Sequence, residues 1–266
     1  QQKVGSNGNA IGIGSPRASL ETNFALKTLV GAENFYSGMN QTEQELLEEV
    51  KRVYQSRTSI ASIKDVESAD VALVLGEDLT NSAPRLALAL RQAVLNRPKE
   101  KAVAIGIPEW HDAAVREFIQ DDRGPLFQAH TQATKLDEIC QSVKQLTPEE
   151  IISFAQWIAH SLENEAPAPK EGKELKEWAE TVAQELKAAK KPVVVSGTSL
   201  QETGLIQAAG NIAAALEREK GDEAKITFAL PENNSLGVAL LSERSLHDAL
   251  KALQSNKQHV IIAEND

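Results

Sequence analysis

Short runs of apolar residues alternate along this chain with longer segments whose apolar positions recur every three or four residues. The run 71–75 is apolar at every position, which is typical of a strand buried on both faces of a parallel sheet. The segment 149–162 instead places its apolar residues at helical spacing. Because strands and helices alternate, the pattern predicts an α/β fold with two Rossmann-like lobes, whose parallel sheets are flanked by helices.

The same pattern locates the individual elements. We expect Leu20, Phe24 and Leu29 to form the buried face of the first helix, and Gly31 to cap its C-terminus. Strands are predicted at 10–14, 34–36, 71–75, 102–105, 126–129, 192–195, 226–228 and 260–263, and helices at 19–30, 46–54, 84–95, 136–146, 149–162, 173–189, 205–216 and 246–253.

The composition changes at about 164–173, where Pro, Ala, Glu and Lys replace the apolar pattern, as in a stiff polar linker. The alternation of strands and helices resumes after it. We therefore expect a first lobe at 1–146 and a second lobe at 147–266. The first residue is not Met, and a predicted strand lies close to the last residue, so we also expect a piece of a longer protein.

Composition excludes several classes of function. The chain has 266 residues, with 28 Lys and Arg against 38 Asp and Glu, which gives a net charge of −10. An acidic chain is a poor nucleic-acid binder, because phosphate backbones require clustered basic residues. The longest apolar uncharged stretch, 205–216, is too short for the ~20 residues that span a bilayer. We expect no nucleic-acid partner and no direct membrane insertion.

The chain has a single cysteine, Cys140. One thiol cannot form an intrachain disulfide or by itself hold an iron–sulfur cluster, and this usage is typical of a reduced, intracellular protein. The five histidines show no metal-binding spacing. We therefore predict no metal site and no catalytic set, and we expect Cys140 to lie in a helix as part of the core.

In doubly wound folds, ligands bind at the carboxyl ends of the strands, so the turns that follow the strands are candidate sites. The dinucleotide fingerprint fails there, because Arg17 stands where the third glycine is required. No P-loop motif occurs. Glu77 and Asp78 form an acidic pair after one strand. The pair is suited to a metal ion or a ribose, although a simpler interpretation is that it compensates a helix dipole.

A second turn contains Ser199 and nearly matches the G-x-S-x-G motif of serine hydrolases, but Gln201 replaces the second glycine. Residues that could complete a triad follow in the hydrolase order, with Asp222 or Asp248 before His259. The alternative is that Ser199 caps the helix that begins near residue 202.

Longer motifs point to a family. The segments GSPRASLETNFAL at 14–26, LVGAENF at 29–35, DVALVLGEDLTNSAPR at 70–85 and NNSLG at 233–237 resemble the G-subunit family of bacterial NADH:quinone oxidoreductase, respiratory complex I. That family belongs to the wider molybdopterin oxidoreductases, which include formate dehydrogenases. The resemblance covers nearly the whole chain, and it implies the formate dehydrogenase type of α/β fold.

In the molybdenum enzymes of this wider family, the turns after the strands embrace a pterin guanine dinucleotide. The resemblance implies that the corresponding residues here form a vestigial cleft. The metal-ligating cysteine or selenocysteine of those enzymes has no counterpart, and Glu77 and Asp78 would face a phosphate. The vestigial cleft residues are Gly76, Asn81, Ser196, Gly197, Asn233, Asn234 and Gly237.

The resemblance also implies a role. The G subunit is expected to carry iron–sulfur clusters in a cysteine-rich N-terminal region that this chain lacks, so we expect no cofactor in this part. The chain would be a structural portion, not catalytic alone, that packs beside the cluster-bearing domain and other peripheral-arm subunits at the cytoplasmic face of the bacterial inner membrane. Two alternatives stay open, a retained pterin- or nucleotide-binding module and a serine hydrolase.

Overall fold

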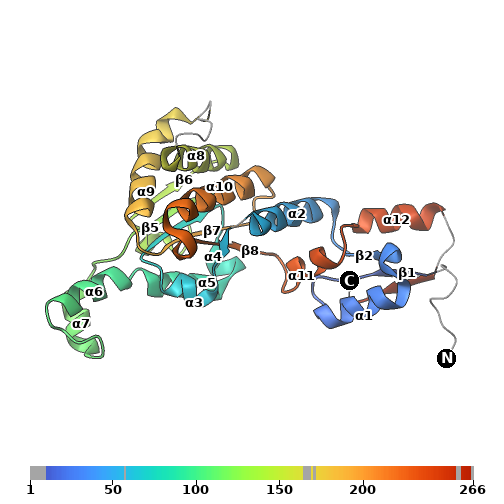
Figure 1. Cartoon of the computed structure of the whole chain (residues 1–266), viewed down its shortest axis with the longest axis horizontal. Helices are drawn as coiled ribbons and strands as arrows, with labels where there is room; N and C mark the ends of the chain where they lie inside the picture. The colour runs from blue at the N-terminus through green and yellow to red at the C-terminus, as the bar shows by residue number, and fades with distance from the viewer. Residues whose placement is uncertain (1–9, 57, 164–168, 170–171, 256–258, 265–266) are drawn as a thin grey trace. The chain divides into compact units, whose positions relative to one another are not determined.

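The structure, a computed structural model, describes residues 10–56, 58–163, 169, 172–255 and 259–264 (Figure 1). The chain forms two compact units. Unit 1 combines residues 1–52 with 230–266, and unit 2 is the continuous segment 53–229. Most of the expected linker at 164–173 lies outside the described residues.

These two units are not the two sequential lobes that we expected, because the boundary at residue 146 falls inside unit 2. The reason lies in the pairing of the strands. β7 (Pro192–Gly197) follows the expected linker, yet it pairs with β4 (Val71–Leu75), which precedes it. Since one set of sheet hydrogen bonds joins both halves of the sequence, the polar segment is a connection within one unit.

Unit 2 is built on a six-stranded, fully parallel sheet in the order β3-β8-β7-β4-β5-β6. The helices α3 and α5 lie on one face, and α8, α9 and α10 lie on the other (Figure 1). The predicted α/β class, with parallel sheets flanked by helices, is confirmed. The other elements are β3 (Ser59–Ile60), α3 (Ile63–Glu67), α4 (Leu79–Ser82), α5 (Pro84–Ala93), α6 (Asn96–Ala104), α7 (Asp112–Ile119), β5 (Leu126–His130), β6 (Ser142–Gln145), α8 (Pro148–Leu162), α9 (Lys176–Ala188), α10 (Thr203–Lys220) and β8 (Lys225–Ala229).

Unit 1 contains a three-stranded parallel sheet in the order β2-β1-β9. Alternate residues of β1 face opposite layers. Ile11 and Ile13 pack toward α12, whereas Gly12 leaves room for Leu26 of α1, whose Cγ would lie 2.8 Å from a Cβ at residue 12. The elements are β1 (Ala10–Ile13), α1 (Leu20–Val30), β2 (Phe35–Tyr36), α11 (Ser235–Leu241), α12 (Leu246–Ser255), β9 (His259–Ile262) and most of α2 (Gln41–Gln55), whose last residues belong to unit 2.

The buried face of α1 differs from the prediction. Its buried residues are Asn23, Leu26 and Val30, whereas the predicted set is exposed. Asn23 occupies an interior position because its amide closes the turn after β1, accepting a hydrogen bond from the Ser15 backbone N–H and donating one to the Ser15 carbonyl, both at 2.9 Å. Gly31 caps the helix as predicted, at φ +90°.

Two predicted elements are wrong in type. Residues 102–105 belong mostly to helix α6. This segment is not a neighbour of any strand in the two described sheets, so it has no partner with which to form a strand. Residues 136–146 contain a 3₁₀ turn at Asp137–Ile139 and then strand β6, with Cys140 between them. β6 is an edge strand, bonded to β5 alone, so it lacks the apolar pattern of a buried strand.

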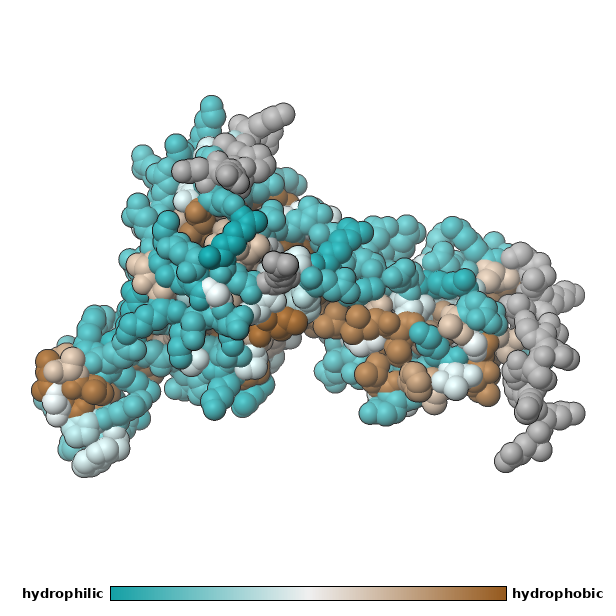
Figure 2. Space-filling model, in the orientation of Figure 1, coloured by the Kyte–Doolittle hydropathy of each residue, from teal (hydrophilic) through white to brown (hydrophobic). Residues whose placement is uncertain are grey.

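The surface of unit 2 that Figure 2 shows is mostly hydrophilic, with an apolar group at the end of the α6–α7 segment and smaller apolar groups elsewhere on the unit. Among the helices of the described residues, none is both long and apolar enough to cross a bilayer.

Candidate functional site

The order of the strands places a switch point in unit 2. From β4 the chain continues to β5 and β6 on one side, whereas β7 and β8 lie on the other. The turns after β4 and β7 therefore run in opposite directions, and the carboxyl ends of these two strands form the switch point at which open α/β sheets bind ligands in a crevice. Gly76, Glu77 and Ser199 come from these two turns, and Ser196 and Gly197 are the last residues of β7.

The crevice is filled by the carboxylate of Glu77, whose residue is 1% exposed. Its Oε1 accepts a hydrogen bond from the backbone N–H of Ser199 at 2.9 Å, and its Oε2 accepts one from the Ser199 Oγ at 2.7 Å. Ser82 donates a further hydrogen bond to Oε2 at 3.1 Å. We call Glu77, Ser82 and Ser199 the Glu77 cluster.

Gly197 permits this arrangement. A Cβ at residue 197 would lie 2.1 Å from the Glu77 Oε1 and 2.6 Å from the carbonyl oxygen of Ala229. In dinucleotide-binding turns, a glycine at the end of a strand gives a pyrophosphate close access to the backbone. Here the same absence of a side chain admits a carboxylate of the chain itself.

The electrostatics of the Glu77 cluster oppose a second anion. Burial raises the pKa of Glu77 above its usual value, while the hydrogen bonds from Ser199 and Ser82 and the nearby His130 act in the opposite direction. A phosphate group would need the donors that Glu77 already uses, and its charge would face a carboxylate. The residues at this crevice therefore do not fit a phosphate-bearing cofactor.

The remaining predicted residues of unit 2 have structural contacts. Gly76 has φ +73°, and Ser196 donates its hydroxyl proton to the Leu75 carbonyl at 3.0 Å. Asn81 donates to the carboxylate of Asp78 at 2.6 Å, and Asp78 caps α4 through the backbone N–H of residue 80. The two acidic residues therefore have different roles. Asp78 caps a helix, in line with the simpler interpretation, whereas Glu77 forms hydrogen bonds to the turn after the neighbouring strand β7.

The predicted residues of unit 1 lie in the turn before α11 and at its start. The backbone N–H of Asn234 donates to the Pro16 carbonyl at 3.0 Å, and its side-chain amide donates to the Ala18 carbonyl at 2.8 Å. Gly237 faces Leu20, whose Cδ1 would lie 3.1 Å from a Cβ there. Asn233 is exposed. Asn234 and Gly237 thus close the turn after β1 within unit 1.

The hydrolase candidates have other partners. Ser199 bonds to Glu77, so it does not cap the following helix, whose N-cap position is Glu202. Asp222 accepts a hydrogen bond from Ser59, and Asp248 accepts hydrogen bonds from Ser245 at the start of α12.

Cys140 and the residue types that ligate metals are the remaining candidates for reactive chemistry. Burial and the charge of Asp137 raise the pKa of the Cys140 thiol to about 12, so it stays protonated at neutral pH. Within the part of the chain that the structure describes, no group of three or more His, Cys, Asp or Glu could hold a metal ion.

Comparison with known proteins identifies the relatives. The G subunit of the NADH-quinone oxidoreductase of Pseudomonas fluorescens is 42% identical over 263 residues, which cover 97% of this chain and 29% of the relative. The chain is a homologue of part of the NADH-quinone oxidoreductase G subunit. The G subunits of Escherichia coli strain K12 and of Salmonella typhimurium are each 40% identical over 260 residues, which cover 96% of this chain and 28% of each relative.

These relatives confirm the resemblance to the G subunit, and the chain spans less than a third of their length. No family model matches the chain. Among solved structures, a chain of the formyltransferase/hydrolase complex from Methylorubrum extorquens, in complex with methylofuran, matches 94% of this chain and 59% of its own length, with a TM-score of 0.47 and 12% identity.

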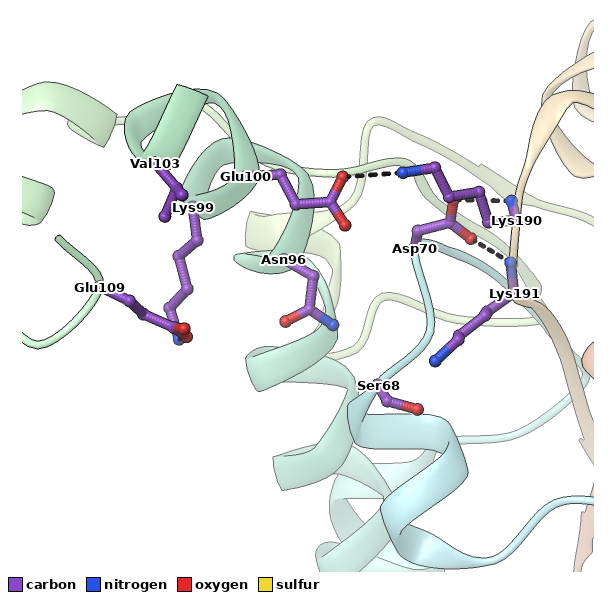
Figure 3. Close-up of a pocket in the computed structure, with 9 residues that line it drawn as sticks. All are labelled: Ser68, Asp70, Asn96, Lys99, Glu100, Val103, Glu109, Lys190 and Lys191. Atoms are coloured by element: carbon purple, nitrogen blue, oxygen red, sulfur yellow. Dashed lines mark hydrogen bonds and ion pairs between the residues drawn. The ribbon is translucent and has the colours of Figure 1, made fainter. Parts of the chain in front are cut away.

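This G-subunit homologue also has a pocket of about 470 Å³ at the opposite edge of the sheet, beside the amino ends of β4 and β7 (Figure 3). Asp70 accepts hydrogen bonds from the backbone N–H groups of Lys190 and Lys191, both at 2.8 Å. Lys190 pairs with Glu100 of α6 at 3.3 Å. Three lysines balance three carboxylates around the pocket, so its charges join α6 to the sheet and favour no single charged ligand. The lining residues are Ser68, Asp70, Asn96, Lys99, Glu100, Val103, Glu109, Lys190 and Lys191.

Proposed function

We propose that this chain is a structural, cofactor-free part of the G subunit, in a parent protein that takes part in electron transfer from NADH to quinone. The observation that carries the proposal is the Glu77 carboxylate, which occupies the switch-point crevice of unit 2 and bonds to the donors of Ser199. A crevice filled by a buried acidic side chain supports a scaffold, because a phosphate-bearing cofactor would have to displace that side chain and its charge.

The names of the relatives support the wider setting of the proposal. The chain would pack beside an iron–sulfur-cluster-bearing region of the parent protein and beside other subunits of the peripheral arm. This assembly would lie on the cytoplasmic face of the bacterial inner membrane. The clusters, and not this chain, would carry the electrons.

Native mass spectrometry of the purified chain tests the absence of a cofactor. We expect the mass of the polypeptide alone, and no stoichiometric iron by elemental analysis. Extra mass that matches a pterin dinucleotide, a nucleotide or a metal would contradict the proposal and favour the alternative of a retained binding module.

Calorimetry with guanosine diphosphate tests the role of Glu77 more directly. We expect no binding heat with the unsubstituted chain. Glu77→Ala removes the carboxylate and frees the Ser199 donors, so this variant is the one in which weak binding should appear; Glu202→Ala, which removes an exposed carboxylate of the same unit, serves as the matched control. Micromolar binding of guanosine diphosphate by the unsubstituted chain would contradict the proposal.

The hydrolase alternative rests on Ser199, whose hydroxyl lies 2.7 Å from a carboxylate oxygen. Any esterase activity of the chain should therefore be compared with that of Ser199→Ala. Under our proposal the two activities are equal, and a loss confined to the variant would favour the hydrolase instead.

A further inference from the structure

β9 is an edge strand of unit 1 that has the composition of a central strand. Among the described strands it pairs with β1 alone, and its sequence, HVII, contains no Lys, Arg, Asp, Glu or Pro. The other edge strands of the two described sheets differ, because β2 and β3 have two residues each and β6, with the sequence SVKQ, is mostly polar. Natural proteins keep exposed edges short or charged, since an apolar edge pairs with other strands. The composition of β9 therefore favours a second neighbouring strand.

The backbone of β9 directs hydrogen-bonding groups away from β1. The N–H of Ala263 donates to the Ile13 carbonyl at 2.9 Å, so the backbone polar groups of Ala263 and, two residues before it, of Ile261 face β1. Successive residues of a strand turn these groups to opposite sides, so those of Val260 and Ile262 face the open edge. A parallel strand along this edge would form hydrogen bonds with them.

One face of β9 is covered by a helix and the other is not. Ile261 belongs to an apolar cluster with residues of α1. Val260 and Ile262 lie beside Ile11 and Ile13 of β1 in the strand register, on the face that carries α12, and α1 and α12 lie on opposite sides of β1 (Figure 1). Ile11 and Ile13 are 1% and 4% exposed under α12, whereas Val260 is 39% and Ile262 58% exposed. The α12 layer thus does not extend over β9.

The hand of the connections in unit 1 indicates where a covering helix would come from. The connection from β1 to β2 runs through α1 on one face, and the chain reaches β9, on the other side of β1, through α12 on the opposite face. Since both the direction and the face are reversed, the two connections have the same hand, as parallel strands almost always require. A further connection of that hand, from β9 to a strand beyond it, would place its helix over Val260 and Ile262.

We propose that, in the parent G subunit, the chain that follows residue 266 supplies this helix and a fourth parallel strand along the free edge of β9. The present chain covers 29% of the Pseudomonas fluorescens relative, so most of such a parent lies outside it. Consecutive elements of a chain are usually neighbours in space, and unit 1 is already assembled from two separate segments. These observations favour the parent chain over a separate protein. The proposal rests on the family and not on the proposed function, so a cofactor bound to this chain would leave it unchanged.

Hydrogen–deuterium exchange, followed by mass spectrometry, tests the fourth strand. In the complete G subunit, purified without other subunits, the amides of Val260 and Ile262 should exchange at least tenfold more slowly than in the 266-residue chain, because a neighbouring strand would bind them. The matched control is β6, whose amides should exchange at the same rate in both proteins. Equal exchange at β9 would overturn the proposal. Equal slowing at β9 and β6 would also overturn it, since a general stabilisation would then explain both.

Photocrosslinking identifies what covers β9. A photoreactive amino acid in place of Ile262, in the complete parent protein within its host cell, should crosslink to a segment that follows residue 266 in the same chain. The same amino acid in place of Leu88, an exposed apolar residue of α5 in unit 2, should give no product with that segment. A product with another subunit or with a second copy would overturn the proposal, as would products confined to residues 1–266 or the absence of any product.

Discussion

The buried carboxylate of Glu77 costs free energy and is held by specific hydrogen bonds. Burying a carboxylate at 1% exposure removes its hydration, and three hydrogen bonds from Ser82 and Ser199 replace part of it. The raised pKa of Glu77 shows that the replacement is incomplete. At the switch point of unit 2, the Glu77 side chain thus occupies the donors of Ser199.

Replacing Glu77 with Gln should change how stability depends on pH. The folded state holds the Glu77 proton more tightly than the unfolded state, because the folded pKa is raised above 4.5. The contribution of Glu77 to stability is therefore fully present below pH 4.5 and declines as the pH rises through the raised folded pKa. Urea unfolding between pH 4 and 8 should show that Glu77→Gln lacks this decline. The free energy of unfolding of the variant, relative to that of the unsubstituted chain, therefore rises with pH.

The control for this measurement is Glu67→Gln, which changes an exposed carboxylate of the same unit. Its stability difference from the parent should stay flat over the same pH range. A flat difference for Glu77→Gln as well would show that burial does not shift the Glu77 pKa.

At the scale of residues, the sequence could locate the turns of the candidate site but not the contacts within them. The strand-end rule places Gly76, Ser196 and Gly197 at the same edge of the sheet, and the structure places them there. The partner of Glu77 could not be read in this way, because Ser199 is 122 residues away. The bond depends on which two strands are neighbours, and that is a property of the whole sheet.

At the scale of elements, the strong hydrophobic patterns predicted the type and place of helices and strands correctly, and the weak patterns did not. The uniformly apolar β4 and the amphipathic α8 lie where the sequence places them. The apolar run at 102–105 fits a turn of helix as well as a short strand, and its type depends on neighbouring strands that it lacks. The opposite error at β6 has a related cause, since an edge strand needs few apolar residues.

The start of α8 supplies a prediction at this scale. The Thr147 hydroxyl accepts from the backbone N–H of Glu150, and the Glu150 carboxylate accepts from that of Thr147, which forms a capping box. Thr147→Ala should destabilise the chain by about 1 kcal/mol and lower its melting temperature by roughly 2–4 °C. Differential scanning calorimetry measures both.

Thr181→Ala is the matched variant, because the Thr181 hydroxyl lies on an exposed face of α9 and donates to the Glu177 carbonyl, so no backbone N–H depends on it. It should cost no more than about 0.5 kcal/mol. Equal losses for the two variants would mean that the capping box contributes nothing beyond the removal of an ordinary threonine.

At the scale of the molecule, the chain leaves unit 1 and later returns to it, so the boundaries of the units cannot be read from the order of the sequence alone. Unit 1 is closed by segments from both ends, whereas unit 2 is continuous and contains the whole six-stranded sheet. The hydrophobic core of unit 2 is likewise drawn from both sides of the polar segment at 164–173, with Val74 and Val195 in one cluster. A composition change marks a polar connection, but it does not show which strands pair across it.

The two divisions predict different folding fragments. Residues 53–229 should unfold in one cooperative urea transition, because every strand of the sheet and every partner of Glu77 lies within them. The pH effect of Glu77→Gln should persist there unchanged. Residues 1–146, the first lobe expected from the sequence, should not fold cooperatively, because they lack β7 and leave the edge of β4 that pairs with it open. Cooperative unfolding of the second fragment, with a broad transition in the first, would show that the sheet does not need the strands that cross the linker.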